Sequence, residues 1–298
     1  MVGSITEAPP VERLVTGTRA GLGLARRFVA GDTLEDAVAA ARHLNRSGLL
    51  VSLDLLGEEV HDGDSATRAT EEYLECLDRI SEERLEANIS VKPTQLGLAI
   101  DPGIAAEAIE RLAARALDVG TTVTIDMEDS RYTEGTVRLF ENAQPGMGNL
   151  GIAIQAYLHR TPADLERLAP LGGHIRLCKG AYVEPEEVAL TSKDEVNEAY
   201  AAQLRTLMAA EETMPAVATH DLSLIELAKT LDVDRVAAFE FQMLYGVRPD
   251  LQLSLVSEGY PLRVYLPFGS QWYPYLTRRL GERPANVWFF LRNLLGPR

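Results

Sequence analysis

The chain alternates between short apolar runs and longer amphipathic segments, and seven of the runs end in ionisable or strongly polar residues. These seven cover residues 89–92, 123–128, 152–157, 175–179, 216–220, 237–242 and 264–268. An eighth run, residues 49–55, precedes them. Runs of this length are typical of buried strands, and their shared polar ending suggests that one end of one sheet carries the chemistry.

Helix signals fill the segments between the runs. Asp32 or Thr33 is expected to cap a helix that continues to about residue 45, and Thr33-Leu34-Glu35-Asp36 has a carboxylate at the third position after the cap. Asp101-Pro102 supplies a cap and a first-turn proline for a helix over 102–117, and Thr161-Pro162 repeats that signature. Further helices are expected at residues 13–30, 65–85, 191–212, 221–231, 249–257 and 284–295.

Strand followed by helix, eight times over, indicates a parallel sheet in an α/β fold. Eight such units in 298 residues close most naturally into a (β/α)8 barrel. The alternative is an open doubly wound sheet, but no strand is followed by a Gly-rich dinucleotide loop. Gly21-Leu22-Gly23 lacks both a third glycine and a preceding strand. We therefore predict a barrel over residues 46–298, preceded by a helical extension over residues 1–45.

Composition narrows the class of partner. The formal net charge is −15, from 44 acidic and 29 basic residues, which argues against a nucleic-acid partner and against firm electrostatic docking to anionic lipid. The two cysteines do not form a CxxC pair, so neither a metal site nor a disulfide framework is expected. No apolar run approaches the ~18–20 residues that span a bilayer. We expect a cytoplasmic protein with at most peripheral contact at the inner face of a membrane.

The polar strand ends predict a shared site. Because side chains two apart on a strand share a face, four pairs are formed: Asp126 with Glu128, Gln155 with Tyr157, Arg176 with Cys178, and Glu240 with Gln242. A rim salt bridge is the better interpretation of Glu128 and Glu240 taken alone. Taken together, the strand ends gather a set of cations and donors that suits an anionic cofactor or substrate: Lys92, Arg176, Lys179 and His220.

The segment from Arg176 to Tyr182 is the densest of these. Gly180 and Ala181 keep the backbone low, so a flat ring can approach it closely. Lys179 admits two further interpretations, a Schiff base with a carbonyl substrate and a solvent-exposed loop lysine. Cys178 is more simply a small packed residue than a nucleophile.

A second cluster follows the last run. Tyr275, Arg278 and Arg279 stand at helical spacing on one face, where two guanidinium groups and a phenol form a receptor for a carboxylate. The alternative is a solvated basic patch on an outer helix. Pro267 and Gly269 interrupt this stretch, which favours a last helix that lies across the barrel mouth instead of packing outside.

These segments resemble the motifs of the proline dehydrogenase family. The resemblance rests on segments that match in one order: Ser90-Val91-Lys92, Thr124-Ile125-Asp126, Gln155-Ala156-Tyr157, Arg176-Leu177-Cys178-Lys179-Gly180-Ala181-Tyr182, Ala218-Thr219-His220, Glu240-Phe241-Gln242 and Tyr275-Leu276-Thr277-Arg278-Arg279-Leu280. It covers roughly residues 45–295 and is similar to the monofunctional bacterial type. The resemblance implies FAD in a distorted (β/α)8 barrel and oxidation of L-proline to 1-pyrroline-5-carboxylate. It also implies electron transfer to a membrane quinone in the first step of proline catabolism.

The resemblance also assigns roles to residues. Three residues are implied as catalytic: Arg176, Asp126 and Tyr265. Arg176 would lie near flavin N5, and Asp126 would orient Tyr265. The groups implied to bind the substrate carboxylate or enclose its ring are Lys92, Tyr182, Leu244, Tyr265, Tyr275, Arg278 and Arg279. The groups implied to bind FAD are Gln155, Arg176, Lys179, Gly180, Ala181, Thr219, His220 and Glu282. Glu282 and Asn286 also match family positions that brace the last helix.

Two other functions fit the same sequence. A Schiff-base lyase or aldolase would use Lys179 as its nucleophile. A barrel without catalytic activity would serve only as an interaction module. Bound flavin that is bleached by proline distinguishes the dehydrogenase from both.

Overall fold

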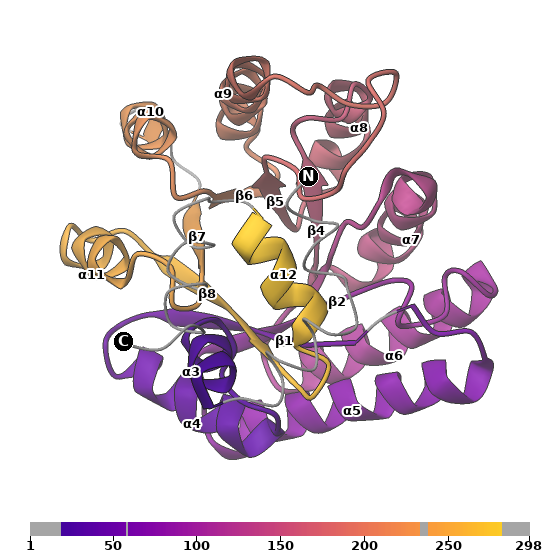
Figure 1. Cartoon of the computed structure of the whole chain (residues 1–298). Coiled ribbons are helices and arrows are strands. Elements are labelled where there is room, and N and C mark those ends of the chain that lie inside the picture. Colours follow the sequence, from indigo (N-terminus) through magenta and orange to yellow (C-terminus); the bar gives the residue numbers. More distant parts are fainter. Residues whose placement is uncertain (1–18, 58, 233–237, 282–298) are drawn as a thin grey trace.

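The computed structural model describes residues 19–57, 59–232 and 238–281, and its eight parallel strands close into a barrel (Figure 1). The strands pair in chain order, and the last closes the ring against the first, with Ser52 opposite Tyr265. Their bounds are β1 Leu50–Leu55, β2 Ala87–Val91, β3 Val123–Ile125, β4 Leu150–Gln155, β5 His174–Cys178, β6 Met214–Ala218, β7 Glu240–Leu244 and β8 Leu262–Phe268. The predicted (β/α)8 barrel is confirmed.

Helices surround the barrel (Figure 1). Their bounds are α3 Arg19–Phe28, α4 Leu34–Asn45, α5 Gly63–Glu82, α6 Pro102–Asp118, α7 Ser130–Met147, α8 Thr161–Leu168, α9 Lys193–Ala209, α10 Leu222–Asp232, α11 Pro249–Ser257 and α12 Tyr273–Gly281, with a 3-10 turn η1 Ala169–Leu171. Helix α7 was not among the individually predicted helices. It contains Pro145, and it does not begin with the cap and first-turn proline that marked other helices in the sequence. The helix predicted at 284–295 lies outside the described residues.

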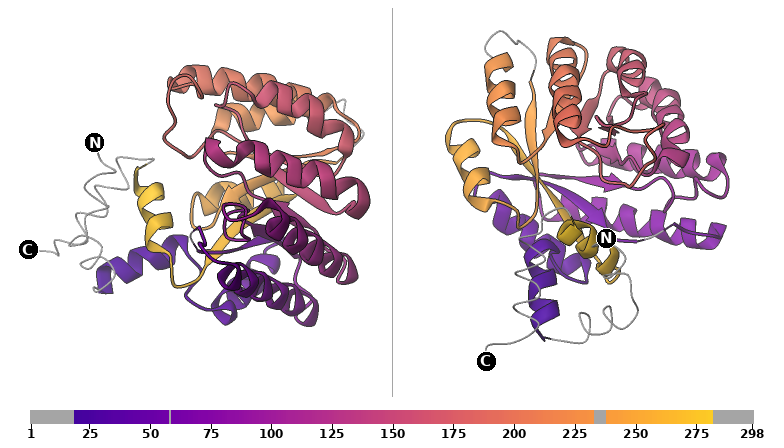
Figure 2. Two further views of the ribbon diagram at one scale, coloured as in Figure 1. Left: turned by 90° about the vertical axis from the view of Figure 1, so that its right-hand side faces the viewer. Right: turned by 45° about the horizontal axis from the view of Figure 1, so that its top comes forward.

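Helix α12 lies across the carboxyl ends of the strands, which we call the barrel mouth (Figures 1 and 2). It stands beside α3, and the two helices share a buried cluster that includes Phe28, Trp272 and Leu276. The end of β8 and the connection after it are fixed to the segment after α3. Pro267 O accepts the Ala30 N–H at 2.9 Å, and the Gly269 N–H donates to Gly31 O at 2.9 Å. The expected position of the last helix over the mouth is therefore confirmed.

Helix α4 occupies the position on the outside of β1 and β8 that a helix following β8 would otherwise fill. Thr33 caps it with the predicted capping box, in which Asp36 bonds back to the cap backbone. Its face of Ala37, Val38 and Ala41 is buried and packs over the pair formed by β1 and β8. The helix that precedes the first strand thus covers the seam between β1 and β8. The domain boundary at residue 45 stays a prediction.

The two faces of the barrel wall differ in polarity. Strand residues that face the helices are apolar, as Val51 and Leu53 are in β1. The alternate positions, which face the barrel interior, carry polar side chains such as Ser52 and Asp54, both fully buried. Barrels of this class usually fill the interior with branched apolar residues. A polar interior must be satisfied by internal hydrogen bonds, so it specifies one arrangement of side chains.

A buried layer at the amino ends of the strands is built around His174. Its Nε2 lies 2.7 Å from Thr124 Oγ1, and Asn88 also donates to that hydroxyl at 3.2 Å. Gly151 makes room for the imidazole, because a Cβ there would lie 2.0 Å from Nε2. Burial lowers the pKa of His174 to about 3, so the ring is neutral near pH 7.

Several local predictions were wrong. The run at 237–242 predicted a strand that ends in Glu240 and Gln242, but β7 begins at Glu240, which therefore lies at the opposite end of the barrel from the mouth. Glu240 does form a salt bridge, with Arg263 at 2.8 Å, but the pair is buried and does not lie at the rim. Thr161 does not cap α8, because its hydroxyl donates instead to Gln155 O at 2.6 Å.

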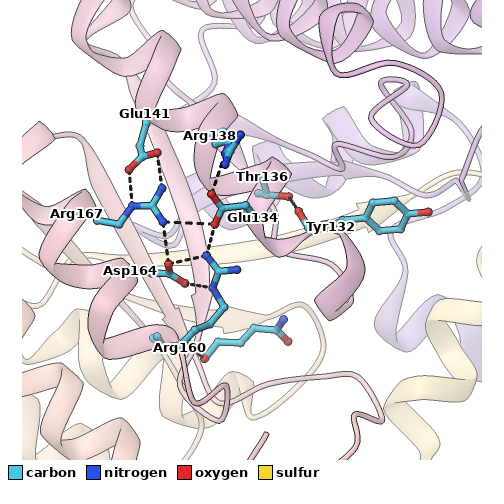
Figure 3. Close-up of polar contacts among 10 residues, drawn as sticks. Tyr132, Glu134, Thr136, Arg138, Glu141, Arg160, Asp164 and Arg167 are labelled. Carbon is cyan, nitrogen blue, oxygen red and sulfur yellow. Dashed lines mark hydrogen bonds and ion pairs between the residues drawn. The ribbon is translucent and has the colours of Figure 1, made fainter. Parts of the chain in front are cut away.

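Helices α7 and α8 are joined on the outside by a network of ion pairs (Figure 3). Arg160 contacts Glu134 at 2.5 Å and Asp164 at 2.7 Å, and Arg167 contacts Glu141 at 2.7 Å. Hydrogen bonds from Arg160 and then from Arg138 lower the pKa of Glu134 to about 2. Several charges that share partners hold two helices together better than isolated surface pairs do.

Candidate active site

A cavity of about 700 Å³ lies at the barrel mouth and is bordered by residues from the strand ends and from α12. Apart from Arg278 and Arg279, every predicted site residue that the structure describes borders this cavity: Lys92, Asp126, Gln155, Arg176, Lys179, Gly180, Ala181, Tyr182, Thr219, His220, Leu244, Tyr265 and Tyr275. The positions of Arg278 and Arg279 lie in α12, but their side chains are outside the described part of the structure. Glu282 and Asn286 also lie outside the described residues.

Arg176 of β5 reaches across the barrel and forms part of the cavity floor. Its Nε donates to Gln242 Oε1 at 2.5 Å, and its Nη1 donates to Ser90 Oγ at 2.9 Å and to Asp126 Oδ1 at 2.5 Å. The guanidinium carbon lies 5.2 Å from the centre of the Tyr265 ring. Contacts from several strands hold this buried cation in one orientation, and pairing with Asp126 offsets the cost of its burial.

Asp126 connects Arg176 to Tyr265. Besides the Arg176 contact, its Oδ1 accepts from Ser90 Oγ at 2.8 Å and its Oδ2 accepts from Tyr265 O–H at 2.7 Å. Burial, and then the Asp126 charge, raises the pKa of Tyr265 well above 10, so the phenol stays protonated and donates. The predicted orientation of Tyr265 by Asp126 thus has a direct hydrogen bond behind it.

Lys92 forms an ion pair with Asp54, a residue that the sequence interpretation did not select. Asp54 is fully buried in β1, and its Oδ2 has no hydrogen-bond partner among the described residues. Burial raises the pKa of Asp54, although the charge of Lys92 opposes this. The sequence signal was present, because Ser52 and Asp54 place two polar groups at alternate positions of an otherwise apolar strand.

Gln155 joins two loops at the cavity wall. Its Nε2 donates to Glu128 O at 2.9 Å, and its Oε1 accepts from Ala181 N at 3.1 Å. The Glu128 side chain accepts two hydrogen bonds from Thr94, at 2.9 and 2.7 Å, instead of forming the rim salt bridge expected for it. Burial raises the pKa of Glu128. Both side chains therefore organise the mouth through neutral partners.

The structure explains why position 180 is a glycine, which the sequence alone did not. Its φ is +132°, and a Cβ at this position would lie 2.4–2.6 Å from atoms of the Tyr157 ring. The loop is also held farther along, where Glu184 accepts from Ser130 N at 2.7 Å and from Ser130 Oγ at 2.6 Å. The close approach to this glycine is thus made by a protein ring.

Lys179 and His220 line another part of the wall. The Lys179 ammonium donates to Asp221 Oδ2 at 2.8 Å and to Asn197 Oδ1 at 2.6 Å. Bonds from Lys179 and then from Ser223 lower the pKa of Asp221 to about 2, so a carboxylate faces the ammonium. His220 Nε2 accepts from Leu244 N at 3.2 Å, which leaves the ring proton on Nδ1. These two hydrogen bonds occupy the Lys179 nitrogen, which does not favour its use as a Schiff-base nucleophile.

Comparison with known proteins identifies the family. The sequence profile described as proline dehydrogenase matches residues 37–292, which is most of the chain. The chain belongs to the proline dehydrogenase family. It is similar to Proline dehydrogenase 1 of Bacillus subtilis subsp. natto, with 40% identity over 282 residues that cover 94% of this chain and 92% of that protein. It is 35% identical over 304 residues to the proline dehydrogenase of Deinococcus radiodurans, covering 98% and 96% of the two chains.

Solved structures agree on the fold. A crystal structure of proline utilization A from Bdellovibrio bacteriovorus, inactivated by N-propargylglycine, matches with a TM-score of 0.80 and 22% identity. The match covers 92% of this chain and 35% of that one, so the chain spans about a third of that longer protein. Family membership, and not the likeness of fold, makes the chain an oxidoreductase of proline catabolism.

Proposed function

We propose that the protein oxidises L-proline to 1-pyrroline-5-carboxylate with bound FAD and passes the electrons to a quinone. The observation that supports the proposal is the cavity at the barrel mouth, which is bordered by most of the residues implied by the family motifs. Arg176, Asp126 and Tyr265 form one hydrogen-bonded group there, and Lys92 borders the same cavity.

The cavity fits a flavin cofactor in size and in donors. Its volume of about 700 Å³ lies within the ~300–1,000 Å³ common for cofactor and ligand sites. Small residues such as Ala153 and Ala218 border it and leave room for a flat ring. Gln155, Lys179 and His220 supply the polar groups that would hold the ring and the phosphates. FAD, when bound, supplies a hydride acceptor at flavin N5.

The substrate would be bound by residues just after β2 and in α12. Lys92, together with Arg278 and Arg279, would bind the proline carboxylate, and Tyr275 would close over the ring from α12. Fixing the carboxylate aims the reacting carbon, and such orientation supplies several kcal/mol of barrier lowering. Asp54 would keep Lys92 aimed at the cavity, because the ion pair restricts its ammonium.

The proposed chemistry forms a C=N bond. A hydride leaves the ring carbon next to nitrogen, and the nitrogen loses its proton to solvent. The amine must be neutral to supply electrons, and the cations Lys92 and Arg176 around it favour the neutral form. Arg176 would also stabilise the negative charge of a reduced flavin, because the orientation of its guanidinium is already fixed.

The visible spectrum of the purified protein tests this proposal. We expect a yellow protein whose absorbance bleaches when L-proline is added without oxygen. A colourless protein that is trapped by borohydride with a carbonyl substrate would favour the lyase. A colourless protein without either reaction would favour an interaction module.

Substitution in α12 tests the substrate assignment. We expect Arg278→Met or Arg279→Met to raise KM for proline at least tenfold while flavin stays bound, because each removes a charged hydrogen-bond donor to the carboxylate. An unchanged KM in both variants would remove these residues from the proposed site.

The electron acceptor is tested separately, by proline-dependent reduction of a short-chain ubiquinone. Within the described ranges, no helix is both long and apolar enough to cross a bilayer. Co-sedimentation of the protein with lipid vesicles, with and without proline, tests peripheral contact.

A further inference from the structure

A chain of hydrogen bonds runs inside the barrel from the cavity floor toward the opposite end. Arg176 Nε donates to Gln242 Oε1 at 2.5 Å, and Gln242 Nε2 donates to Glu240 Oε1 at 2.6 Å. Arg263 then holds both oxygens of Glu240, at 2.8 and 3.1 Å. Arg263 is itself anchored by a bond from Nη1 to Val51 O at 3.0 Å. Glu240 does not border the cavity, so its influence on the site must pass through Gln242.

The chemistry of the partners permits one orientation of the Gln242 amide. A guanidinium only donates hydrogen bonds, and a carboxylate only accepts them. The amide must therefore turn its oxygen toward Arg176 and its NH2 toward Glu240. We propose that Glu240, held by Arg263, is a positioning residue that fixes the Gln242 amide and thereby sets the orientation of the Arg176 guanidinium at the cavity floor.

Ionised Glu240 is essential to this arrangement. Burial opposes ionisation, but the charge and hydrogen bonds of Arg263, with the bond from Gln242, outweigh it and lower the pKa of Glu240. A neutral amide at position 240 could accept or donate, so it would no longer dictate which way Gln242 turns. Arg176 would then lose its fixed Nε acceptor while keeping Asp126 and Ser90 on Nη1. Its guanidinium would be held less firmly, by those two bonds and by the 3.5 Å contact from Nη2 to Ser52 Oγ.

The first experiment needs neither cofactor nor turnover. In protein labelled with ¹⁵N-arginine, the Arg176 Nε–H signal is identified by its loss in Arg176→Lys. We expect Glu240→Gln to shift this signal and to speed its exchange with water at least tenfold. An Arg176 signal that stays unchanged in Glu240→Gln, in a folded protein, would overturn the proposal. Gln242→Met, which removes the amide but keeps the Glu240–Arg263 pair, should move the signal in the same way.

A double-mutant cycle separates positioning from a general loss of stability. This part rests on the proposed function, and it measures kcat and the midpoint potential of the bound flavin. We expect Glu240→Gln to lower kcat about tenfold, since one hydrogen bond to a charged group is lost. In the Gln242→Met background, the same change should have no further effect on kcat or on the potential, because the link is already broken.

Thr124→Val is the matched control. It removes a buried hydrogen bond to His174 in the same interior, but Thr124 has no bond to the Glu240 chain. We expect it to lower the melting temperature without changing the flavin potential or the Arg176 signal. Equal losses of kcat from Glu240→Gln in the wild-type and Gln242→Met backgrounds would overturn the proposal. Failure of the wild-type protein to bind flavin would refute the proposed function, while the NMR experiment would still decide this inference.

Discussion

Replacing Gly180 by alanine should destabilise the protein through two separable effects. The backbone at φ +132° is strained for any residue with a Cβ, which costs about 1–3 kcal/mol. The new Cβ would also lie 2.4 Å from Tyr157 Cδ1, and overpacking of this kind costs about 1–3 kcal/mol. Together they predict a loss of about 2–6 kcal/mol, which for a chain of 298 residues corresponds to a fall of at least ~3 °C in melting temperature.

The assay is a double-mutant cycle with Tyr157→Ala, followed by urea denaturation and by thermal melting. Tyr157→Ala alone leaves a cavity and costs about 3–5 kcal/mol. In the double variant the Tyr157 ring is absent, so the Cβ at position 180 no longer clashes, and the two costs should combine with a favourable coupling of about 1–3 kcal/mol. Strictly additive costs would refute the steric reasoning and leave backbone strain, or a ligand that packs on the glycine, as the reason for Gly180.

Three further predictions follow from other parts of the fold. Phe28→Ala should raise KM for proline about tenfold with little change in kcat, because α3 supports α12 through their shared cluster; steady-state kinetics on the folded variant checks this, and an unchanged KM contradicts it. His174→Asn should flatten the pH dependence of the urea midpoint. The pKa of His174 is about 3 in the folded protein and 6.5 ordinarily, so between these values only the unfolded chain gains a proton, and the free energy of unfolding falls by up to ~1.4 kcal/mol per pH unit as pH decreases. The exposed His61→Asn should keep the wild-type slope. Glu134, with a pKa lowered from 4.5 to about 2, contributes stability that is complete above pH 4.5 and is lost as pH falls toward 2; Arg160→Met should weaken this acid dependence in thermal melts, and an unaltered profile would argue against the network.

The barrel could be predicted from sequence because its signal is repeated. Strand and helix alternate around the ring, and an error in one unit leaves the others in place. The predicted bounds of β7 were wrong because Phe239, Glu240 and Phe241 alternate without a sharp boundary. Only the pairing of Glu240 with Arg263 on β8 places Glu240 inside the barrel. Periodicity gives the face of a side chain but not its height along the barrel axis.

Site residues near the carboxyl ends of strands could be predicted from the sequence. Site residues at the amino ends or in the middle of strands were harder to predict. Lys92, Asp126 and Arg176 belong to motifs with visible polar endings. Asp54 and Gln242 lie in the barrel interior, and their importance depends on partners from distant strands. Local sequence does not contain such pairings. The roles of Arg278 and Arg279 stay predictions, since their side chains lie outside the described part of the structure.

The position of α4 over the seam between β1 and β8 has a consequence for biosynthesis. Ribosomes release the chain from its amino end, so α4 and β1 emerge long before β8, the strand that pairs with β1. Arg263 and Val51, which bond across this seam, are 212 positions apart. Until β8 arrives, the apolar face of Ala37, Val38 and Ala41 lacks half of its platform, and one edge of β1 is open to strand pairing with other chains. The nascent protein should therefore depend on chaperones at this seam, and the seam should close late in folding because its contacts are among the most distant in sequence.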